Sequence, residues 1–136
     1  MKNNKILISL FAISSLLAGC QTVQVAKDAA VLDVSFQWSG KSGCSSTSPA
    51  MTVDNVPAGT QFLDIKLTDL DKPGYNHGGG IISYNGRNIP EGVLRERYTG
   101  PCPPMGSHTY EFTVMALDSD KSVAIGKGSA KKKYPE

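Results

Sequence analysis

The sequence lacks an excess of charge of either sign and is poor in cysteine, histidine and aromatic residues. Its 136 residues hold 14 Lys and Arg against 12 Asp and Glu, with three Cys, two His and one Trp. Proteins that bind nucleic acid carry a clear basic patch or excess, so nucleic acid is not expected as a partner. Side chains suited to metal, redox or acid–base chemistry are also few.

Several patterns of known chemistry are missing as well. The chain contains no CxxC motif, which argues against a redox or metal role for its cysteines. It contains no Gly-x-Ser-x-Gly nucleophile elbow, so a hydrolase is not expected, although residues 77–80 (His-Gly-Gly-Gly) resemble the oxyanion-hole sequence of lipases. There is no internal repeat and no helical period longer than two turns. These absences favour a mainly β protein that is not an enzyme.

The N-terminus has the pattern of a bacterial lipoprotein signal. Two early lysines precede residues 6–17, an apolar run too short to span a bilayer comfortably. Residues 17–20 (Leu-Ala-Gly-Cys) resemble a lipobox, so we expect cleavage before Cys20 and acylation of Cys20, palmitate included. An ordinary signal peptide followed by a chance cysteine is the alternative. Acyl chains on one residue would hold the protein firmly to a membrane.

The residue after the cysteine bears on localisation. Gln21 is not the Asp that resembles an inner-membrane retention signal. We therefore expect anchoring in the outer membrane of the bacterial envelope, facing the periplasm. The domain prediction is a signal peptide over residues 1–19, a lipidated tether over 20–30 and one β domain over 31–136.

Two cysteines remain once Cys20 carries lipid. Cys44 lies in a predicted loop, and Cys102 lies within a proline-rich stretch. In an oxidising periplasm two such cysteines are more often bonded than free. We expect a Cys44–Cys102 disulfide that pins one loop against the other.

Alternation of apolar and polar residues predicts the strands. The expected extended segments are 31–38, 48–53, 62–68, 81–84, 109–117, 122–125 and 130–134. Asn85-Gly86 is a hairpin turn signal, and residues 91–97 are the best helical candidate, although they are few. Residues 131–133, all lysine, fit a solvated edge strand better than a basic membrane patch. The predicted class is mainly β, with two antiparallel layers.

Two stretches carry the residues suited to binding. The first runs from Asp69 through Asp71 and His77 to Gly80, between two predicted strands. The second, residues 98–112, is rich in Pro and Gly and leads through His108 into the longest predicted strand. Pro fixes the backbone, and Gly allows a close approach that a Cβ would block. Together the stretches supply two imidazoles and two carboxylates.

These stretches resemble the two signature regions of the phosphatidylethanolamine-binding protein (PEBP) family, which includes the Raf kinase inhibitor-like proteins. The first matches as Asp69-x-Asp71-x-Pro73 followed by His77. The second matches as Gly100-Pro101-Cys102-Pro103-Pro104-x-Gly106-x-His108-x-Tyr110-x-Phe112 and is the more specific. The resemblance covers about residues 31–118.

The resemblance implies a large central antiparallel sheet packed on a smaller sheet, with at most short helices. It also implies a small surface cavity for phosphate-like anions, including phospholipid head groups. We expect no cofactor and no metal. Carried over position by position, the ligand residues are Asp69, His77, Gly100 and His108, with Asp71 and Tyr110 as supports. We expect the carboxylate beside the anion to be protonated, so that it donates a hydrogen bond.

The sequence departs from the family in the pocket wall and at the C-terminus. Gly78 stands where most members have an aromatic residue, and Tyr75 is the candidate replacement for that pocket wall. The C-terminal helix that closes the site in larger members has no counterpart, so a more open site is expected. The function predicted is a membrane-anchored, non-enzymatic binder of a small anion or phospholipid head group.

Two other readings stay open. A metal site would draw on the two histidines and two aspartates, but their spacing lacks a compact pair such as His-x₃-His. A structural or partner-binding envelope lipoprotein with a degenerate pocket is the main alternative, and the sequence names no protein partner. Kinase inhibition by eukaryotic relatives is not carried over, because function belongs to a site rather than to a fold.

Overall fold

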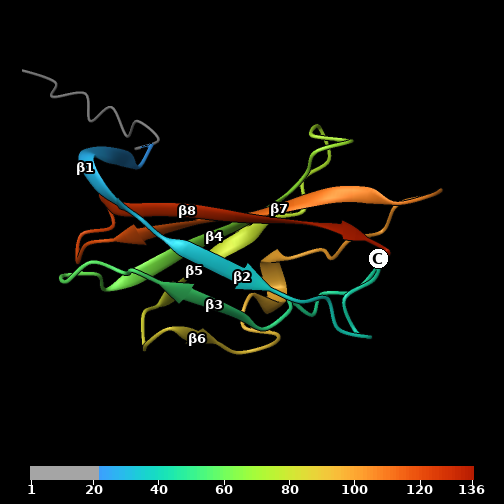
Figure 1. The fold of residues 1–136 in the computed structure, drawn as a ribbon, viewed down its shortest axis with the longest axis horizontal. Coiled ribbons are helices and arrows are strands. Elements are labelled where there is room, and N and C mark those ends of the chain that lie inside the picture. Colours follow the sequence, from blue (N-terminus) through green and yellow to red (C-terminus); the bar gives the residue numbers. More distant parts are fainter. Residues whose placement is uncertain (1–21) are drawn as a thin grey trace, which may run out of the picture.

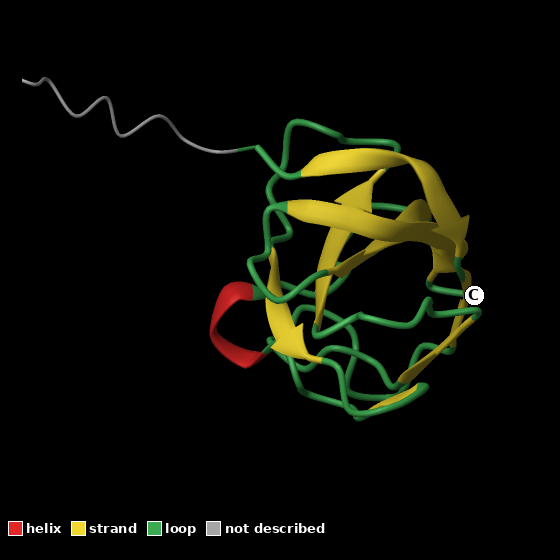
Figure 2. Cartoon of the chain, turned by 90° about the vertical axis from the view of Figure 1, so that its left-hand side faces the viewer, coloured by secondary structure: helices red, strands yellow, loops and turns green. Residues whose placement is uncertain are grey.

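The structure, a computed structural model, describes residues 22–136, so the predicted signal peptide and Cys20 lie outside the described residues. The elements in chain order are β1 (Gln24–Val31), β2 (Asp33–Phe36), β3 (Met51–Asp54), β4 (Phe62–Asp69), β5 (Gly79–Ser83), β6 (Asn88–Ile89), η1 (Arg95–Arg97), β7 (His108–Leu117) and β8 (Val123–Tyr134). Within residues 22–136, no helix has the length and hydropathy needed to cross a bilayer. Figure 2 shows the short helical segment at the periphery of the strands.

A five-stranded sheet in the order β1-β8-β7-β4-β5 forms the larger layer. The predicted alternation over residues 62–68 and 109–117 is confirmed, because β4 and β7 pair antiparallel with eight partnered residues each. Every second side chain is buried on the inner face of this pair, where the core residues are Leu63, Ile65, Leu67, Phe112, Val114 and Ala116. Alternation with a period of two places these residues together.

A three-stranded sheet in the order β2-β3-β6 covers the inner face of the larger one. Phe36 of β2 reaches Phe112 of β7 with ring centroids 4.9 Å apart in an edge-to-face arrangement. Trp38 packs edge-to-face on Tyr134 at 5.6 Å. The prediction of a central sheet packed on a smaller one, with at most short helices, is therefore confirmed.

The N-terminal prediction needs correction. The tether expected over residues 20–30 is wrong for residues 24–30, which belong to β1 and pair in parallel with β8. Val25 and Val31 are largely exposed, and β1 shows no alternation of buried and exposed side chains. Backbone pairing with β8 stabilises this strand, so the hydrophobic pattern of the sequence gives no sign of it.

Two further expectations differ from the structure. Asn85-Gly86 does not close a hairpin, because β5 belongs to the larger sheet and β6 to the smaller. The two closing segments are a single 12-residue strand, β8, whose first half is covered by β1. The lysines at 131–133 lie in its second half, beyond the residues that pair with β1. The edge prediction therefore holds for that half.

The two ends of the larger sheet carry different loops. β7 begins and β4 finishes at one end, where the loops after β4 and before β7 project in Figure 1. β1 begins at the opposite end, where Gln24 pairs with Val123. The sequence motifs singled out above lie at the first of these ends.

Candidate functional site

The two predicted motifs meet at one end of the larger sheet. Asp69 is the last residue of β4, and His108 is the first of β7. Because these strands run antiparallel with Asp69 opposite Tyr110, the carboxylate and the His108 imidazole come together. His77 comes from the loop between β4 and β5. The resulting set of Asp69, His77, His108 and Tyr110 is called the Asp–His site below.

Asp69 is the centre of the Asp–His site. Its side chain is only 5% exposed. The Oδ1 atom accepts hydrogen bonds from the backbone N–H groups of Asp71 at 2.9 Å and Lys72 at 3.0 Å. The Oδ2 atom accepts one from His108 Nδ1 at 2.7 Å. Both oxygens are therefore engaged, which meets the requirement for burying a carboxylate.

These bonds decide the protonation of Asp69. Burial alone raises the pKa of Asp69, but the bonds from His108 and from the Lys72 and Asp71 amides outweigh it and lower the pKa below its usual value. Hydrogen bonds to the charged form favour that form. The expectation of a protonated, donating Asp69 is therefore wrong, because its neighbours are all donors and an ionised carboxylate can only accept.

The histidine rings are oriented by different partners. His77 Nδ1 donates to the Thr99 carbonyl at 2.8 Å, because a carbonyl oxygen only accepts. This leaves His77 Nε2 facing Asp69 Oδ2 at 3.9 Å, beyond hydrogen-bond distance. His108 uses Nδ1 for Asp69, so its Nε2 remains available on a side chain that is 20% exposed. Of the two rings, His108 is the one that solvent reaches.

Tyr110 completes the Asp–His site, and Tyr75 lies beside it. Tyr110 is fully buried, with its ring 5.3 Å from His77 and 6.2 Å from His108. Among residues 22–136 its hydroxyl has no hydrogen-bond partner. Burial, with the negative charge of Asp69 as a second cause, raises the pKa of Tyr110 to about 12. Tyr75 lies 4.7 Å from the His77 ring, which is the aromatic wall proposed for it.

Asp71 and Gly100 are structural in their contacts. Asp71 Oδ2 accepts from the Thr109 backbone N–H at 2.6 Å and so ties the loop after β4 to the start of β7. The Gly100 N–H donates to the Ser45 carbonyl at 2.7 Å. That amide is already used and is not offered to a ligand. A Cβ on Gly100 would overlap the Ser42 carbonyl oxygen, so the glycine serves loop packing.

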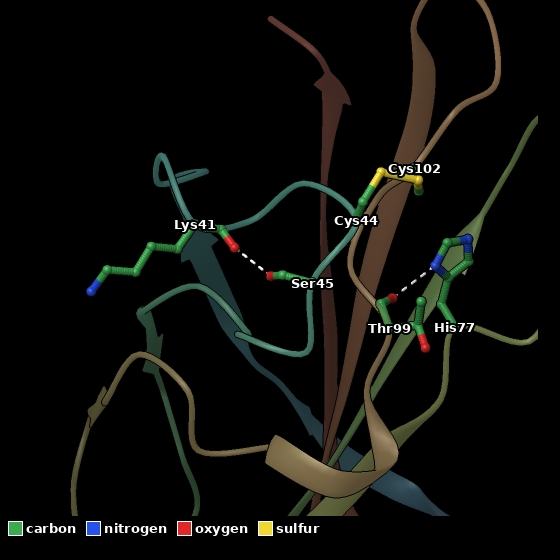
Figure 3. Close-up of a disulfide and its surroundings, with 6 residues drawn as sticks. All are labelled: Lys41, Cys44, Ser45, His77, Thr99 and Cys102. Carbon is green, nitrogen blue, oxygen red and sulfur yellow. Dashed lines mark hydrogen bonds between the residues drawn. A yellow bond between two sulfur atoms is a disulfide. The ribbon is translucent and has the colours of Figure 1, made fainter.

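The predicted disulfide is present and lies next to the Asp–His site. Cys44 and Cys102 are bonded with Cα atoms 4.7 Å apart, which confirms the pairing. The Cys44 N–H also donates to the Pro101 carbonyl at 2.9 Å. Figure 3 shows the disulfide near the Thr99–His77 hydrogen bond. The disulfide thus holds the loop that carries Thr99.

The glycine run at 78–80 leads into β5, which begins at Gly79, and has a packing role. The Gly78 N–H donates to Asn76 Oδ1 at 2.9 Å, and Gly79 and Gly80 pair with β4. Gly78 has a φ of +74°, and a Cβ there would overlap the Arg97 carbonyl oxygen. The run therefore permits close backbone approach at a position that favours glycine.

The metal alternative finds no support in this geometry. Within the part of the chain that the structure describes, no group of three or more His, Cys, Asp or Glu side chains is placed to hold a metal ion.

The residues predicted from the two motifs thus play two different parts in the structure. The structure brings Asp69, His77, His108 and Tyr110 together, whereas Asp71 and Gly100 are engaged in holding the surrounding loops. Thr99 was missed, because a backbone carbonyl contributes no side-chain signal to a sequence. Its position directly before the glycine of the second motif was the only available hint.

The chain is similar in sequence to two proteins of Escherichia coli. The chain is 32% identical to YbhB of Escherichia coli K12 over 102 residues, 54% of this chain and 61% of YbhB. It is 30% identical to YbcL of the same strain over 106 residues, 58% of each chain. The chain thus spans about three-fifths of the length of the curated relatives it matches.

Solved structures share the fold. A PEBP homologue from Chlamydia trachomatis superposes with a TM-score of 0.61 at 20% identity, covering 80% of this chain and 99% of that one. Escherichia coli YbcL, described as a member of the mammalian PEBP family, gives 0.59 at 21%, covering 76% and 97%. The sequence profile of the family described as phosphatidylethanolamine-binding protein matches residues 22–134. This chain therefore belongs to the phosphatidylethanolamine-binding protein family.

Proposed function

We propose that this protein is a non-enzymatic binding protein whose Asp–His site takes a small phosphate-like anion. The observation that supports this most directly is that His108, fixed through Nδ1 by the ionised Asp69, keeps its Nε2 available on a partly exposed ring, which stacks on the Tyr110 ring with centroids 6.2 Å apart. A protonated His108 ring then presents an N–H donor in a fixed direction. A charge-assisted hydrogen bond to a phosphate oxygen is stronger than one between neutral groups.

The Tyr110 hydroxyl supports a ligand at this position. A buried polar group without a partner costs about 1–3 kcal/mol. A phosphate oxygen that accepts from this hydroxyl removes that cost, and the bound state gains accordingly. A ligand without acceptor oxygens leaves the hydroxyl unpaired and gains nothing from it.

The charge of the site sets a condition on binding. The ionised Asp69 repels an anion, and one protonated histidine only balances that charge. Two protonated imidazoles outweigh the single carboxylate, so a site with net positive charge requires both rings to be charged.

A phosphate-like ligand could be a free phosphate ester or the head group of a phospholipid. The test is a titration of the full chain in a non-ionic maltoside detergent with phosphate, phosphoethanolamine and a short-chain phosphatidylethanolamine. The His77 and His108 ring signals are followed by NMR. Saturable shifts of both rings with all three probes support the shared phosphate chemistry, whereas shifts with the lipid alone point to a membrane source.

The control for this titration is His108→Ala, which removes the exposed donor. The proposal requires that His108→Ala abolishes the response, while Glu111→Gln, outside the site, leaves it unchanged. If neither ring of the unaltered chain moves at millimolar concentrations, the anion site is refuted. A partner-binding lipoprotein with a degenerate pocket then becomes the better reading.

We also propose that a lipid on Cys20 holds the protein at the outer membrane, facing the periplasm. The support is the lipobox-like sequence at residues 17–20 together with the apolar run before it. Intact-mass spectrometry of the membrane-extracted protein tests this. A mass showing acyl chains on a chain that begins at Cys20 is expected, and an unmodified Cys20 contradicts the anchor.

A further inference from the structure

A hollow of about 370 Å³ lies on the outer face of the larger sheet, which points away from the three-stranded sheet. It borders the start of β5, where three glycines carry no side chains to fill the space. Its walls come from Asp64, Ile65, Lys66 and Thr68 of β4, from Thr113 and Met115 of β7, and from Asn76, Gly78, Gly79 and Gly80. The space that these residues line is called the outer hollow below.

Asp64 is the unusual member of the outer hollow. Its carboxylate is partly buried and makes no hydrogen bond or ion pair with any residue in the described range 22–136. Burial raises the pKa of Asp64, and the charge of Lys66 offsets only part of that effect. A carboxylate withdrawn from water without a partner is unfavourable. Its surroundings therefore favour the arrival of a cation.

Lys66 supplies the opposite charge on the same face. Residues two apart on a strand point to the same side and are about 7 Å apart. The Lys66 side chain is exposed and forms no salt bridge within residues 22–136. The two opposite charges therefore flank the hollow without forming a direct ion pair, which suits a ligand that carries both signs of charge.

The remaining walls fit a short polar molecule. Met115 lies directly across from Asp64, and Thr113 directly across from Lys66. The threonine hydroxyl can donate to or accept from a ligand, and the methionine offers an apolar contact for methylene groups. At the third side, glycine backbone lets a ligand approach closely.

We propose that the outer hollow is a second binding site, for a small zwitterion with an ammonium group and a carboxylate group, such as an amino acid. The ammonium group lies against Asp64 and the carboxylate group against Lys66. Thr113 hydrogen-bonds the ligand, and Met115 contacts its methylene groups.

This site is independent of the Asp–His site. Asp64 and Asp69 are five residues apart on β4, so their side chains point to opposite faces of the sheet, roughly 17 Å apart along the strand. The failure of one proposal therefore leaves the other standing. Zwitterion binding moves signals of the outer hollow without moving those of His108.

The test uses the full chain in maltoside detergent near neutral pH, with β-alanine as the probe. The backbone amide signals of Gly78, Gly79 and Gly80 and the methyl signal of Met115 are followed by NMR. Saturable shifts with β-alanine are expected, and much weaker binding is expected for ethylammonium or propionate, which carry one charge each. Equal responses to all three probes, or none to β-alanine at millimolar concentrations, overturn the proposal.

Matched variants test the two charges. Asp64→Asn and Lys66→Gln are each expected to weaken β-alanine binding by about tenfold or more. Glu111→Gln and Lys131→Gln remove an acid and a base that pair with each other at 3.8 Å on the same face, and binding in these controls stays within about twofold of the unaltered chain. Unchanged affinity in Asp64→Asn refutes the assignment. Because Asp64 makes no hydrogen bond, this variant is expected to fold, and its amide spectrum away from the hollow checks that it does.

Discussion

His77 donates its Nδ1 proton to the carbonyl of Thr99 over 2.8 Å, and this one bond fixes which ring nitrogen faces the buried carboxylate. The carbonyl belongs to a loop that the Cys44–Cys102 disulfide and the Gly100–Ser45 backbone bond hold in place. The orientation of a site residue thus depends on residues distant in sequence.

Removing the disulfide is expected to affect both stability and the His77 ring. The bond closes a sequence separation of 58 residues, and native disulfides typically contribute about 2–4 kcal/mol to the free energy of unfolding. A Cys44→Ser, Cys102→Ser variant should unfold in less urea, followed by the fluorescence of the single tryptophan, Trp38. NMR signals of His77 should move more than those of His108. Unaltered His77 signals in a folded variant would show that Thr99 holds its position without the disulfide.

Gly100→Ala tests the loop packing without touching either cysteine. The added Cβ would overlap the Ser42 carbonyl oxygen and crowd that of Ser45 at 3.1 Å, so the loops must separate. Overpacking of this kind costs about 1–3 kcal/mol, measured as a drop in the free energy of unfolding. Gly40→Ala is the matched control, because a Cβ there meets nothing within 4 Å. Equal losses in the two variants would contradict the packing argument.

The charge of Asp69 predicts a pH dependence of stability. Its pKa is lowered in the folded state, so the ionised form stabilises the fold at pH values above the ordinary carboxyl pKa. That contribution is lost as the pH falls through the lowered, folded-state pKa. Asp69→Asn should therefore flatten the acid side of the stability–pH curve measured by urea unfolding. The exposed Asp33→Asn variant should keep the original curve, and an unchanged slope in Asp69→Asn would count against an ionised Asp69.

Tyr110→Phe should separate folding from binding. The hydroxyl is buried without a partner, so its removal is expected to leave the melting temperature equal or higher. Loss of a hydrogen bond to the ligand should weaken phosphate binding by about two- to tenfold, in line with a net 0.5–1.5 kcal/mol for one bond. Calorimetric melting and phosphate titration provide the two measurements. A large drop in melting temperature would reveal a partner for the hydroxyl and remove this support for the anion site.

Much of the fold could be predicted because burial on one face of a strand leaves alternation in the sequence. Alternation predicted the bounds of β4 and β7 to within one residue at each end. It could not give β1, whose partner is the backbone of β8 at the far end of the chain and whose side chains are mostly exposed. It also could not show that Asn85-Gly86 passes between sheets, since a turn signal is local and sheet membership is not.

The sequence could predict which residues form the Asp–His site, but not the charge and contacts of each one. The motif placed Asp69, His77 and His108 together, but the charge of Asp69 depends on two amides that point at it only because of the fold of the loop after β4. The role of Gly100 was likewise set by the loop that packs on it, which lies more than 50 residues earlier in the chain. Such contacts are properties of tertiary structure.

The parallel pairing of β1 with β8 also sets the distance between the start of β1 and the Asp–His site. From the row where Gln24 meets Val123 to the row where His108 meets Tyr134, β8 advances by eleven residues, or roughly 36 Å. With the proposed lipid on Cys20, just before β1, the attachment point and the Asp–His site would lie towards opposite ends of the sheet, separated by about the length of β8.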